Sequence, residues 1–237
     1  MCADALLLSG GVRVKRVAMF GGTFDPVHRG HIQMATELKA YFRLDEMRLV
    51  PCHIPPHRPQ PIANVNQRLE MLRLAVEDHP DLTIDTVELD SPDTSYSLNT
   101  LKVLREELGN DVSLSIGMGM DSLASLASWH RWRELLNFGH IVVAARPGYQ
   151  LPESGELIDF IEAHRGEAID VQQQAKGKVV LAELSLVNIS STVVREALLQ
   201  NENVSSLLPQ KVSEYLHTNA IYTPNSLQKT QKVSFNG

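Results

Sequence analysis

The sequence predicts an α/β fold in which a doubly wound, Rossmann-like parallel sheet is flanked by helices. Apolar runs of strand length alternate along the chain with segments whose apolar residues recur at helical spacing. This alternation is typical of parallel strands joined by crossover helices. The first apolar run, 14–20, leads directly into Gly21 and Gly22. In doubly wound folds, phosphate groups bind between such a strand and the following helix.

In the first half of the chain, three segments are read as strands: 14–20, 47–51 and 82–89. Apolar residues at helical spacing predict three helices, one from His31, one over 65–76 and one over 98–108. Prolines recur between the second strand and the second helix. They exclude a regular helix or a central strand from that stretch.

In the second half, three more segments are read as strands: 112–116, 141–145 and 179–184. Short helices are expected around Leu123 and Leu135, another at 158–163, and two more from about Ser191 and Ser205. We therefore predict one domain over 14–222, an N-terminal extension at 1–13 and a disordered tail at 223–237.

The composition is that of a globular protein, with 43% hydrophobic and 21% charged residues among 237. The net charge of −6 provides no basic field, so we expect no nucleic-acid partner. No stretch reaches the length of a membrane span, and no secretory signal is apparent. The two cysteines, Cys2 and Cys52, form no disulfide framework. These features predict a cytoplasmic protein, and they leave open whether it forms a homo-oligomer.

The most informative segment is GGTFDPVHRGH, from Gly21 to His31. We expect its two glycines to let the backbone turn sharply and approach a ligand. The helix that follows presents free amides and a positive end to an anion. His28 and His31 are three residues apart, so both rings could donate hydrogen bonds to one phosphate chain during phosphoryl or nucleotidyl transfer.

Other functions of this segment fit less well. Two histidines could bind a metal, but no third ligand follows at a helical spacing and no HExxH pattern is present. The segment is neither a Walker A loop nor a GxGxxG dinucleotide motif. Exposed histidines without a function are common, and this remains the alternative reading of His28 and His31.

A second segment, ISSTVVR from Ile189 to Arg195, begins a helix near the end of the predicted domain. Ser190, Ser191 and Thr192 could simply cap that helix. Ser191 and Arg195 are four residues apart and share a helix face, so a hydroxyl, free amides and a guanidinium could form a second anion site.

Both segments resemble signatures of the HxGH nucleotidyltransferases, in the form found in nicotinate-nucleotide adenylyltransferases. The resemblance implies that His28, His31 and Arg195 stabilise the transferring phosphates. It further implies that ATP contacts the glycine-rich turn and the second segment, at Gly21, Gly22, Thr23, Phe24, Ser190, Ser191 and Thr192.

Four weaker matches concern the acceptor. Pro55-Pro56-His57-Arg58 resembles a family loop over the active site, so His57 and Arg58 are candidate phosphate contacts. Ser95-Tyr96-Ser97 resembles an SYT element, with Ser97 in place of threonine. Asp121 matches the family's G-x-D and would meet a ribose, and Trp129 falls where relatives stack an aromatic ring on the pyridine. The predicted mononucleotide contacts are therefore Tyr96, Ser97, Asp121 and Trp129, although His130 stands where relatives often have tyrosine.

The resemblance implies adenylyl transfer from ATP to nicotinate mononucleotide in NAD synthesis, with Mg²⁺ accompanying ATP and no metal held by protein side chains. Two alternatives remain at this stage. The acceptor could be nicotinamide mononucleotide, or both nucleotides. In a different class, the protein could be a nucleotide-binding regulator that has lost catalysis.

Overall fold

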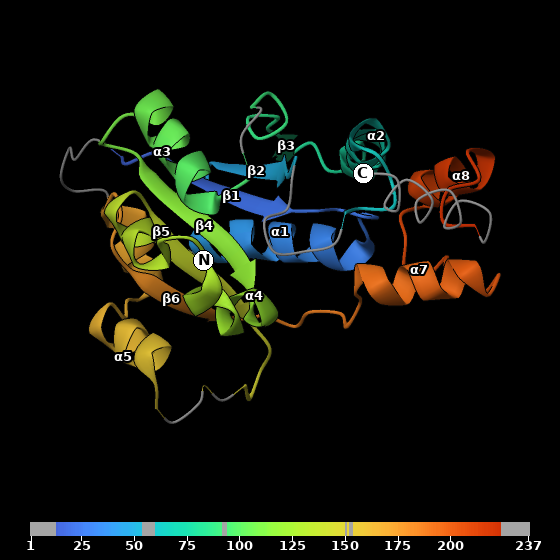
Figure 1. Cartoon of the computed structure of the whole chain (residues 1–237). Helices are drawn as coiled ribbons and strands as arrows, with labels where there is room; N and C mark the ends of the chain where they lie inside the picture. The colour runs from blue at the N-terminus through green and yellow to red at the C-terminus, as the bar shows by residue number, and fades with distance from the viewer. Residues whose placement is uncertain (1–12, 54–59, 92–93, 150, 152–153, 224–237) are drawn as a thin grey trace, which may run out of the picture.

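The computed structural model describes residues 13–53, 60–91, 94–149, 151 and 154–223. Within them, one sheet contains β1 (Arg16–Gly22), β2 (Glu46–Pro51), β3 (Leu82–Ile84), β4 (Ser113–Gly119), β5 (His140–Ala145) and β6 (Val179–Glu183). The strand order is β3-β2-β1-β4-β5-β6 and every neighbouring pair is parallel (Figure 1). This order reverses direction between β1 and β4, which confirms the doubly wound, Rossmann-like class.

Helices cover both faces of the sheet. They are α1 (Arg29–Phe42), α2 (Val65–Val76), α3 (Ser97–Leu108), α4 (Met120–Ala124), α5 (Glu156–Ala163), α6 (Ala168–Gln173), α7 (Ser191–Leu199) and α8 (Gln210–Thr218). Two short 3₁₀ helices, η1 (Leu126–Ser128) and η2 (Trp132–Asn137), lie between β4 and β5. No helix in the described part of the chain combines the length and the apolar character needed to cross a bilayer.

The side-chain alternation of β1 divides the core into two layers. Ala18 and Phe20 face a cluster shared with α1, α2, α6, α7 and α8, whereas Val17 and Met19 face a cluster shared with α3, α4, α5 and the 3₁₀ helices. All four side chains are at most 5% exposed. A strand buried on both faces reads as a continuous apolar run, which is why this strand was visible in the sequence.

The strand predicted at 82–89 is wrong beyond Ile84, where β3 ends. The carboxylate of Asp85 accepts a hydrogen bond of 3.0 Å from the amide of Val87, and this local turn replaces further sheet pairing. Leu89 and Asp90 then donate to the carbonyl of Thr86. The residues after β3 therefore form turns that lead towards α3.

Two helix predictions near the C-terminal end also need correction. The last helix begins at Gln210 rather than at about Ser205, because Pro209 occupies its N-cap and the preceding residues form turns. Helix α6 was not predicted at all. It has six residues and only Val171 is buried, so it presents too little apolar periodicity to be recognised.

The sheet opens at the carboxyl ends of its two central strands. Pairing between β1 and β4 is recorded from Arg16–Ser113 to Met19–Ile116, although the strands continue to Gly22 and Gly119. Pairing of β1 with β2 continues to Gly22. The two central strands therefore separate over their last three residues, at the topological switch point where ligands of such sheets bind.

Candidate functional site

The chain leaves β1 through the first motif, but the sharp turn that was predicted at its two glycines is not there. Gly21 and Gly22 belong to the strand, and neither has a positive φ. The reversal occurs instead at Phe24, whose φ is 51°, and at the cis peptide bond between Asp25 and Pro26. A Cβ on Gly22 would lie 2.9 Å from the ring of Phe24. Glycine is needed at position 22 because the buried Phe24 ring folds back onto the strand.

His28 and His31 form the N-terminal cap of α1, which begins at Arg29. The amide of His31 donates to Nδ1 of His28 at 3.3 Å, and the amide of His28 donates to Nδ1 of His31 at 3.2 Å. The rings stack with centroids 3.6 Å apart. The two predicted histidines are therefore brought together at a helix N-terminus, where anions are favoured.

This reciprocal cap also fixes the tautomer of the rings. Because each Nδ1 accepts a hydrogen bond from an amide, the proton of each neutral ring is on Nε2. His28 is 4% exposed, and burial lowers its pKa to about 4. His28 is consequently neutral at pH 7 in the free protein and presents an Nε2–H donor.

The second motif docks on the turn of the first. Ser190 is the N-cap of α7, and its hydroxyl accepts from the amide of Val193 at 3.3 Å. The Ser191 hydroxyl instead donates to the carbonyl of Pro26 at 2.9 Å. Capping thus belongs to Ser190, while Ser191 holds the two motifs together.

Arg195 makes a second link between the motifs. Its guanidinium donates to the carbonyl oxygen of Asp25 at 2.7 Å and to the hydroxyl of Thr192 at 3.2 Å. The side chain remains 24% exposed. Segments 165 residues or more apart in sequence therefore place a cation and two hydroxyls beside the first motif.

The predicted acceptor elements lie at neighbouring positions along the same sheet edge. Asp121 is exposed in the first turn of α4, directly after β4. Tyr96 precedes α3, Ser97 begins it, and the ring of Tyr96 packs against that of His130 at 4.5 Å between centroids. Trp129 is half-buried against the apolar layer formed by α3, α4 and the 3₁₀ helices. His57 and Arg58 lie outside the described residues.

A buried arginine, which the sequence analysis missed, connects the first motif to the acceptor side. Arg68 is 1% exposed and donates to the carbonyl of Thr23 at 2.8 Å and to the carbonyl of His53 at 3.4 Å. The amide of His53 donates to the hydroxyl of Ser95 at 2.9 Å. The only signal of Arg68 in the sequence was a charged residue at helical spacing from Met71.

The chain of hydrogen bonds continues to a buried carboxyl. Glu88 is 8% exposed and accepts from the hydroxyl of Thr100 at 2.6 Å. Burial raises the pKa of Glu88, while hydrogen bonds from Thr100 and Ser95 oppose that rise. Glu88 therefore joins the segment before α3 to the first turn of that helix.

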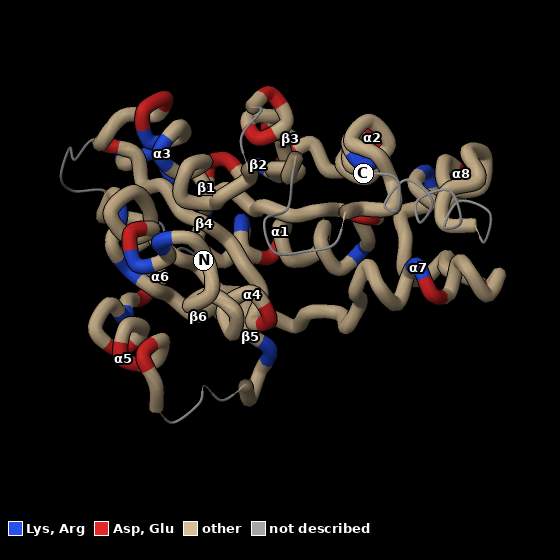
Figure 2. The backbone as a smooth tube through the Cα atoms, in the orientation of Figure 1, with Lys and Arg blue, Asp and Glu red and all other residues tan. Residues whose placement is uncertain are grey.

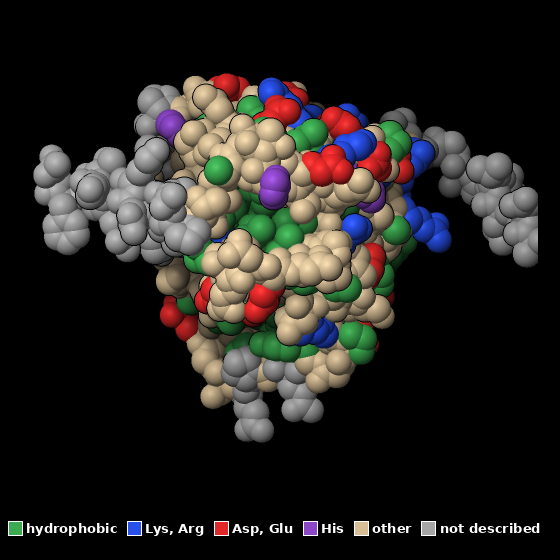
Figure 3. Space-filling view, turned by 90° about the vertical axis from the view of Figure 1, so that its right-hand side faces the viewer, with side chains coloured by type: hydrophobic (Ala, Val, Ile, Leu, Met, Phe, Trp, Pro, Cys, Tyr) green, Lys and Arg blue, Asp and Glu red, His purple; other side chains and the backbone are tan. Residues whose placement is uncertain are grey.

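Figure 3 views the molecule from the side towards which β1 points. It shows a hollow floored by hydrophobic side chains, with a histidine at its rim. Lys and Arg are interspersed with Asp and Glu along the described backbone in Figure 2. Cations at the motifs are therefore local features of an acidic chain, and not part of a broad basic face.

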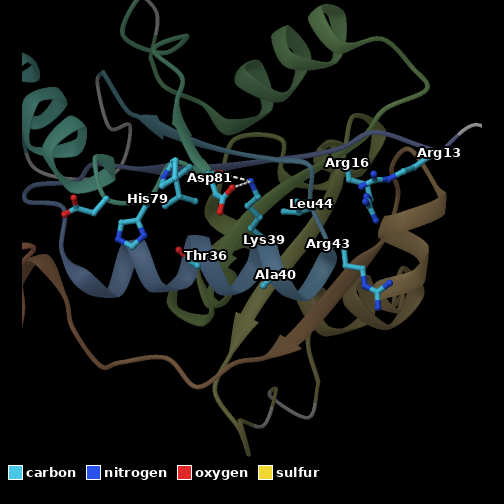
Figure 4. Close-up of a pocket in the computed structure, with 12 residues that line it drawn as sticks. Arg13, Arg16, Thr36, Lys39, Ala40, Arg43, Leu44, His79 and Asp81 are labelled. Atoms are coloured by element: carbon cyan, nitrogen blue, oxygen red, sulfur yellow. Dashed lines mark hydrogen bonds and ion pairs between the residues drawn. The ribbon is translucent and has the colours of Figure 1, made fainter. Parts of the chain in front are cut away.

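A cavity of about 700 Å³ lies at the opposite, amino end of the sheet, beside α1 (Figure 4). Its cationic lining residues include Arg13, Arg16, Lys39 and Arg43. Arg13 and Arg16 pair with Asp45, and Lys39 donates to the carbonyl of Asp81 at 2.7 Å. Because no residue of either signature segment lines this cavity, we place the candidate site at the carboxyl end, where both segments lie.

Comparisons with known proteins identify the family of the chain. Residues 19–197 match the cytidylyltransferase-like family model. A protein of Cellvibrio japonicus named "Probable nicotinate-nucleotide adenylyltransferase" is 41% identical over 206 residues, which cover 87% of this chain and 98% of that protein. A protein of the same name from Pectobacterium atrosepticum is 42% identical, with 86% of this chain and 97% of that protein covered.

A solved structure shares the fold. Plasmodium falciparum nicotinic acid mononucleotide adenylyltransferase, complexed with NaAD, has a TM-score of 0.68 at 16% identity and covers 88% of this chain and 97% of that one. Both signature segments lie within residues 19–197, the range that the family model matches. The chain therefore belongs to the nicotinate-nucleotide adenylyltransferases of the cytidylyltransferase-like family.

Proposed function

We propose that this protein joins ATP to nicotinate mononucleotide, forming nicotinate adenine dinucleotide (deamido-NAD) and pyrophosphate in NAD biosynthesis. The family of the chain supports this activity. A 5′-phosphate oxygen of the mononucleotide attacks the α-phosphorus of ATP in line. The bond from that phosphorus to the bridging oxygen breaks, and pyrophosphate leaves with the oxygen. Because the nucleophile is already a phosphate anion, no side chain has to form a covalent intermediate.

The observation that carries the assignment is the stacked His28–His31 pair at the N-terminus of α1. Its Nε2–H groups would donate to phosphate oxygens on which negative charge increases during transfer. Arg195, anchored on the carbonyl of Asp25, would hold the departing pyrophosphate. Gly21, an exposed residue at the end of β1, would let the triphosphate approach the backbone.

On the acceptor side, we assign the ribose to Asp121 and the pyridine to Trp129, with Tyr96 and Ser97 beside them. The Tyr96–His130 ring contact supports this placement, because it joins α3 to the residues after Trp129. His130 would then add an aromatic ring beside Tyr96.

Nucleotidyltransferases of this family generally use a divalent metal, and we propose Mg²⁺ that enters as part of the Mg·ATP substrate. Mg²⁺ prefers phosphate oxygens and water. The carboxylate of the first motif, that of Asp25, already accepts hydrogen bonds from two amides and a hydroxyl. The scarcity of cysteine supports a cytoplasmic location.

The direct test supplies the purified protein with ATP, Mg²⁺ and either nicotinate mononucleotide or its amide, and separates the products by chromatography. We expect dinucleotide mainly from nicotinate mononucleotide. Equal use of both nucleotides would replace the selective assignment with a dual one. No dinucleotide from either would refute the proposed activity.

The assignment of the histidine pair is tested by His31→Ala, with His217→Ala, an exposed histidine on α8, as the control. Loss of a preorganised donor to a transition-state phosphate lowers kcat by roughly 100-fold or more. We expect that loss for His31→Ala and normal turnover for His217→Ala. A folded His31→Ala protein with near-normal kcat would remove His31 from the mechanism.

A further inference from the structure

The carboxylate of Asp25 is held by groups that come from outside the first motif. It is buried, with 6% of the residue exposed. One oxygen accepts from the amide of Ile62, and the other accepts from the amide of Ala63, both at 3.0 Å. The hydroxyl of Tyr222 donates to the second oxygen at 2.6 Å. Two segments remote in sequence thus converge on one acidic side chain at the site.

The hydroxyl of Tyr222 stays protonated and therefore acts as a hydrogen-bond donor. It is 1% exposed, and burial together with the neighbouring Asp25 carboxylate raises its pKa far above the usual range. Its backbone has a φ of 58°, and Phe24, next to Asp25, has a φ of 51°. Non-glycine residues keep such conformations where their surroundings fix them. Both ends of the Tyr222–Asp25 contact are therefore closely determined.

The position of this carboxylate affects Arg195. Nη1 of Arg195 donates to the backbone carbonyl of Asp25 at 2.7 Å, while the nearest carboxylate oxygen of the same residue is 4.0 Å away. A guanidinium and a carboxylate at that separation readily form a shorter, bidentate pair. Such a pair would neutralise Arg195 and turn its donors away from a phosphate. The bonds from Tyr222, Ile62 and Ala63 oppose this rearrangement.

We propose that Tyr222 is a positioning residue for ATP: its hydroxyl holds the Asp25 carboxylate so that the guanidinium of Arg195 remains available to the triphosphate. Tyr222 acts through Arg195 and does not touch the substrate. The proposal rests on the proposed function of Arg195. It gives a residue that follows α8, outside both signature motifs, a role in ATP binding.

The test is Tyr222→Phe, which removes the hydroxyl and preserves the ring. Tyr215→Phe is the matched control, since it removes a hydroxyl from the neighbouring helix α8 and leaves the Asp25 contacts intact. KM values for ATP and nicotinate mononucleotide are measured separately, together with kcat. We expect the KM for ATP to rise about tenfold in Tyr222→Phe, as for one charge-assisted hydrogen bond. The KM for the mononucleotide should stay within about twofold, with Tyr215→Phe normal throughout.

A double-mutant cycle with Arg195→Ala separates a positioning role from a general structural one. If Tyr222 acts through Arg195, adding Tyr222→Phe to Arg195→Ala should change the KM for ATP no further. Additive effects, or a fall in kcat together with an equal rise of both KM values, would overturn the proposal. Thermal melting shows whether each variant is folded. If a variant is destabilised, its kinetic constants are measured at a lower temperature, where it remains folded. Wild-type dinucleotide formation in the same series tests the underlying activity independently.

Discussion

At the end of β1, the two adjacent glycines have different steric surroundings. A Cβ on Gly22 would meet the ring of Phe24 at 2.9 Å, whereas a Cβ on Gly21 would meet only the Met19 side chain, at 3.7 Å. Phe24 is 1% exposed and has a left-handed backbone, so its ring has little room to move. Of the two glycines, only Gly22 therefore has no room for a side chain.

This difference predicts unequal effects of two alanine substitutions on stability. Gly22→Ala should lower the free energy of unfolding by about 1–3 kcal/mol, as overpacking does in buried positions. Gly21→Ala should change it by much less, because its added methyl makes an ordinary contact. Urea unfolding of both variants provides the measurement. Equal stabilities would show that the Phe24 ring adjusts freely.

The residues that hold the site were harder to predict from the sequence than those expected to perform the chemistry. His28, His31 and Arg195 stand in short motifs, so their residue types and spacings can be read locally. Arg68 and Tyr222 act across 45 and 197 residues. Their contacts depend on tertiary structure that no local spacing specifies.

At the scale of single elements, α3 depends on a buried carboxyl outside it. Glu88 accepts from the hydroxyl of Thr100 in the first turn of the helix, at 2.6 Å. Tyr96 and Ser97 lie at the same end of α3. The orientation of this helix end, and of the acceptor residues we assign to it, is thus linked to Glu88.

Thr100→Val should disrupt this link with little change of volume. The substitution leaves the buried Glu88 carboxyl without one donor, which costs about 1–3 kcal/mol of stability. We also expect the KM for nicotinate mononucleotide to rise more than the KM for ATP. Thr100→Ser, which keeps the hydroxyl, should retain both properties. If Thr100→Val matches the wild type in stability and KM, Glu88 does not support this end of α3.

Elements were predictable where burial imposes a regular pattern. The apolar spacing of α2 and α3 gave their bounds closely, because each packs one face against the sheet. The prediction failed at β3, where the Asp85 side chain ends the strand, and at α6, which buries a single residue. A strand end set by a local side-chain hydrogen bond, and a helix as short as α6, leave no periodic pattern in the sequence.

At the scale of the whole molecule, the switch point brings together motifs from both halves of the chain. The first motif runs from the end of β1 into α1, and Asp121 follows β4. Helix α7 docks on the Asp25–Pro26 turn after the chain has completed the sheet. The strand alternation predicted this class of fold. The hydrogen-bonded path from Thr23 through Arg68 and His53 to Ser95 required the folded structure. Through that path, we expect the two substrate sites to share one rigid support.

Two buried histidines make the stability of the whole fold dependent on pH. Burial lowers the pKa of His28 to about 4, and burial also lowers the pKa of His140, whose ring lies between the carbonyl of Gln174 and the amide of Lys178. An unfolded histidine binds a proton near pH 6.5. From there down to about pH 4, the unfolded chain therefore holds more protons than the folded one, and stability falls as pH decreases.

The contribution of His28 to this decline can be measured separately. Between pH 7 and pH 5, His28 alone should lower the free energy of unfolding by about 2 kcal/mol, at roughly 1.4 kcal/mol per pH unit below 6.5. His28→Asn removes the titrating ring but keeps an oxygen that can cap the amide of His31. Urea unfolding at pH 7, 6 and 5 should therefore give a shallower decline for His28→Asn than for the wild type. His140 remains in both proteins and contributes to the residual slope. Parallel declines would mean that His28 is protonated in the folded state and that its ring is less desolvated than its burial at the cap of α1 implies.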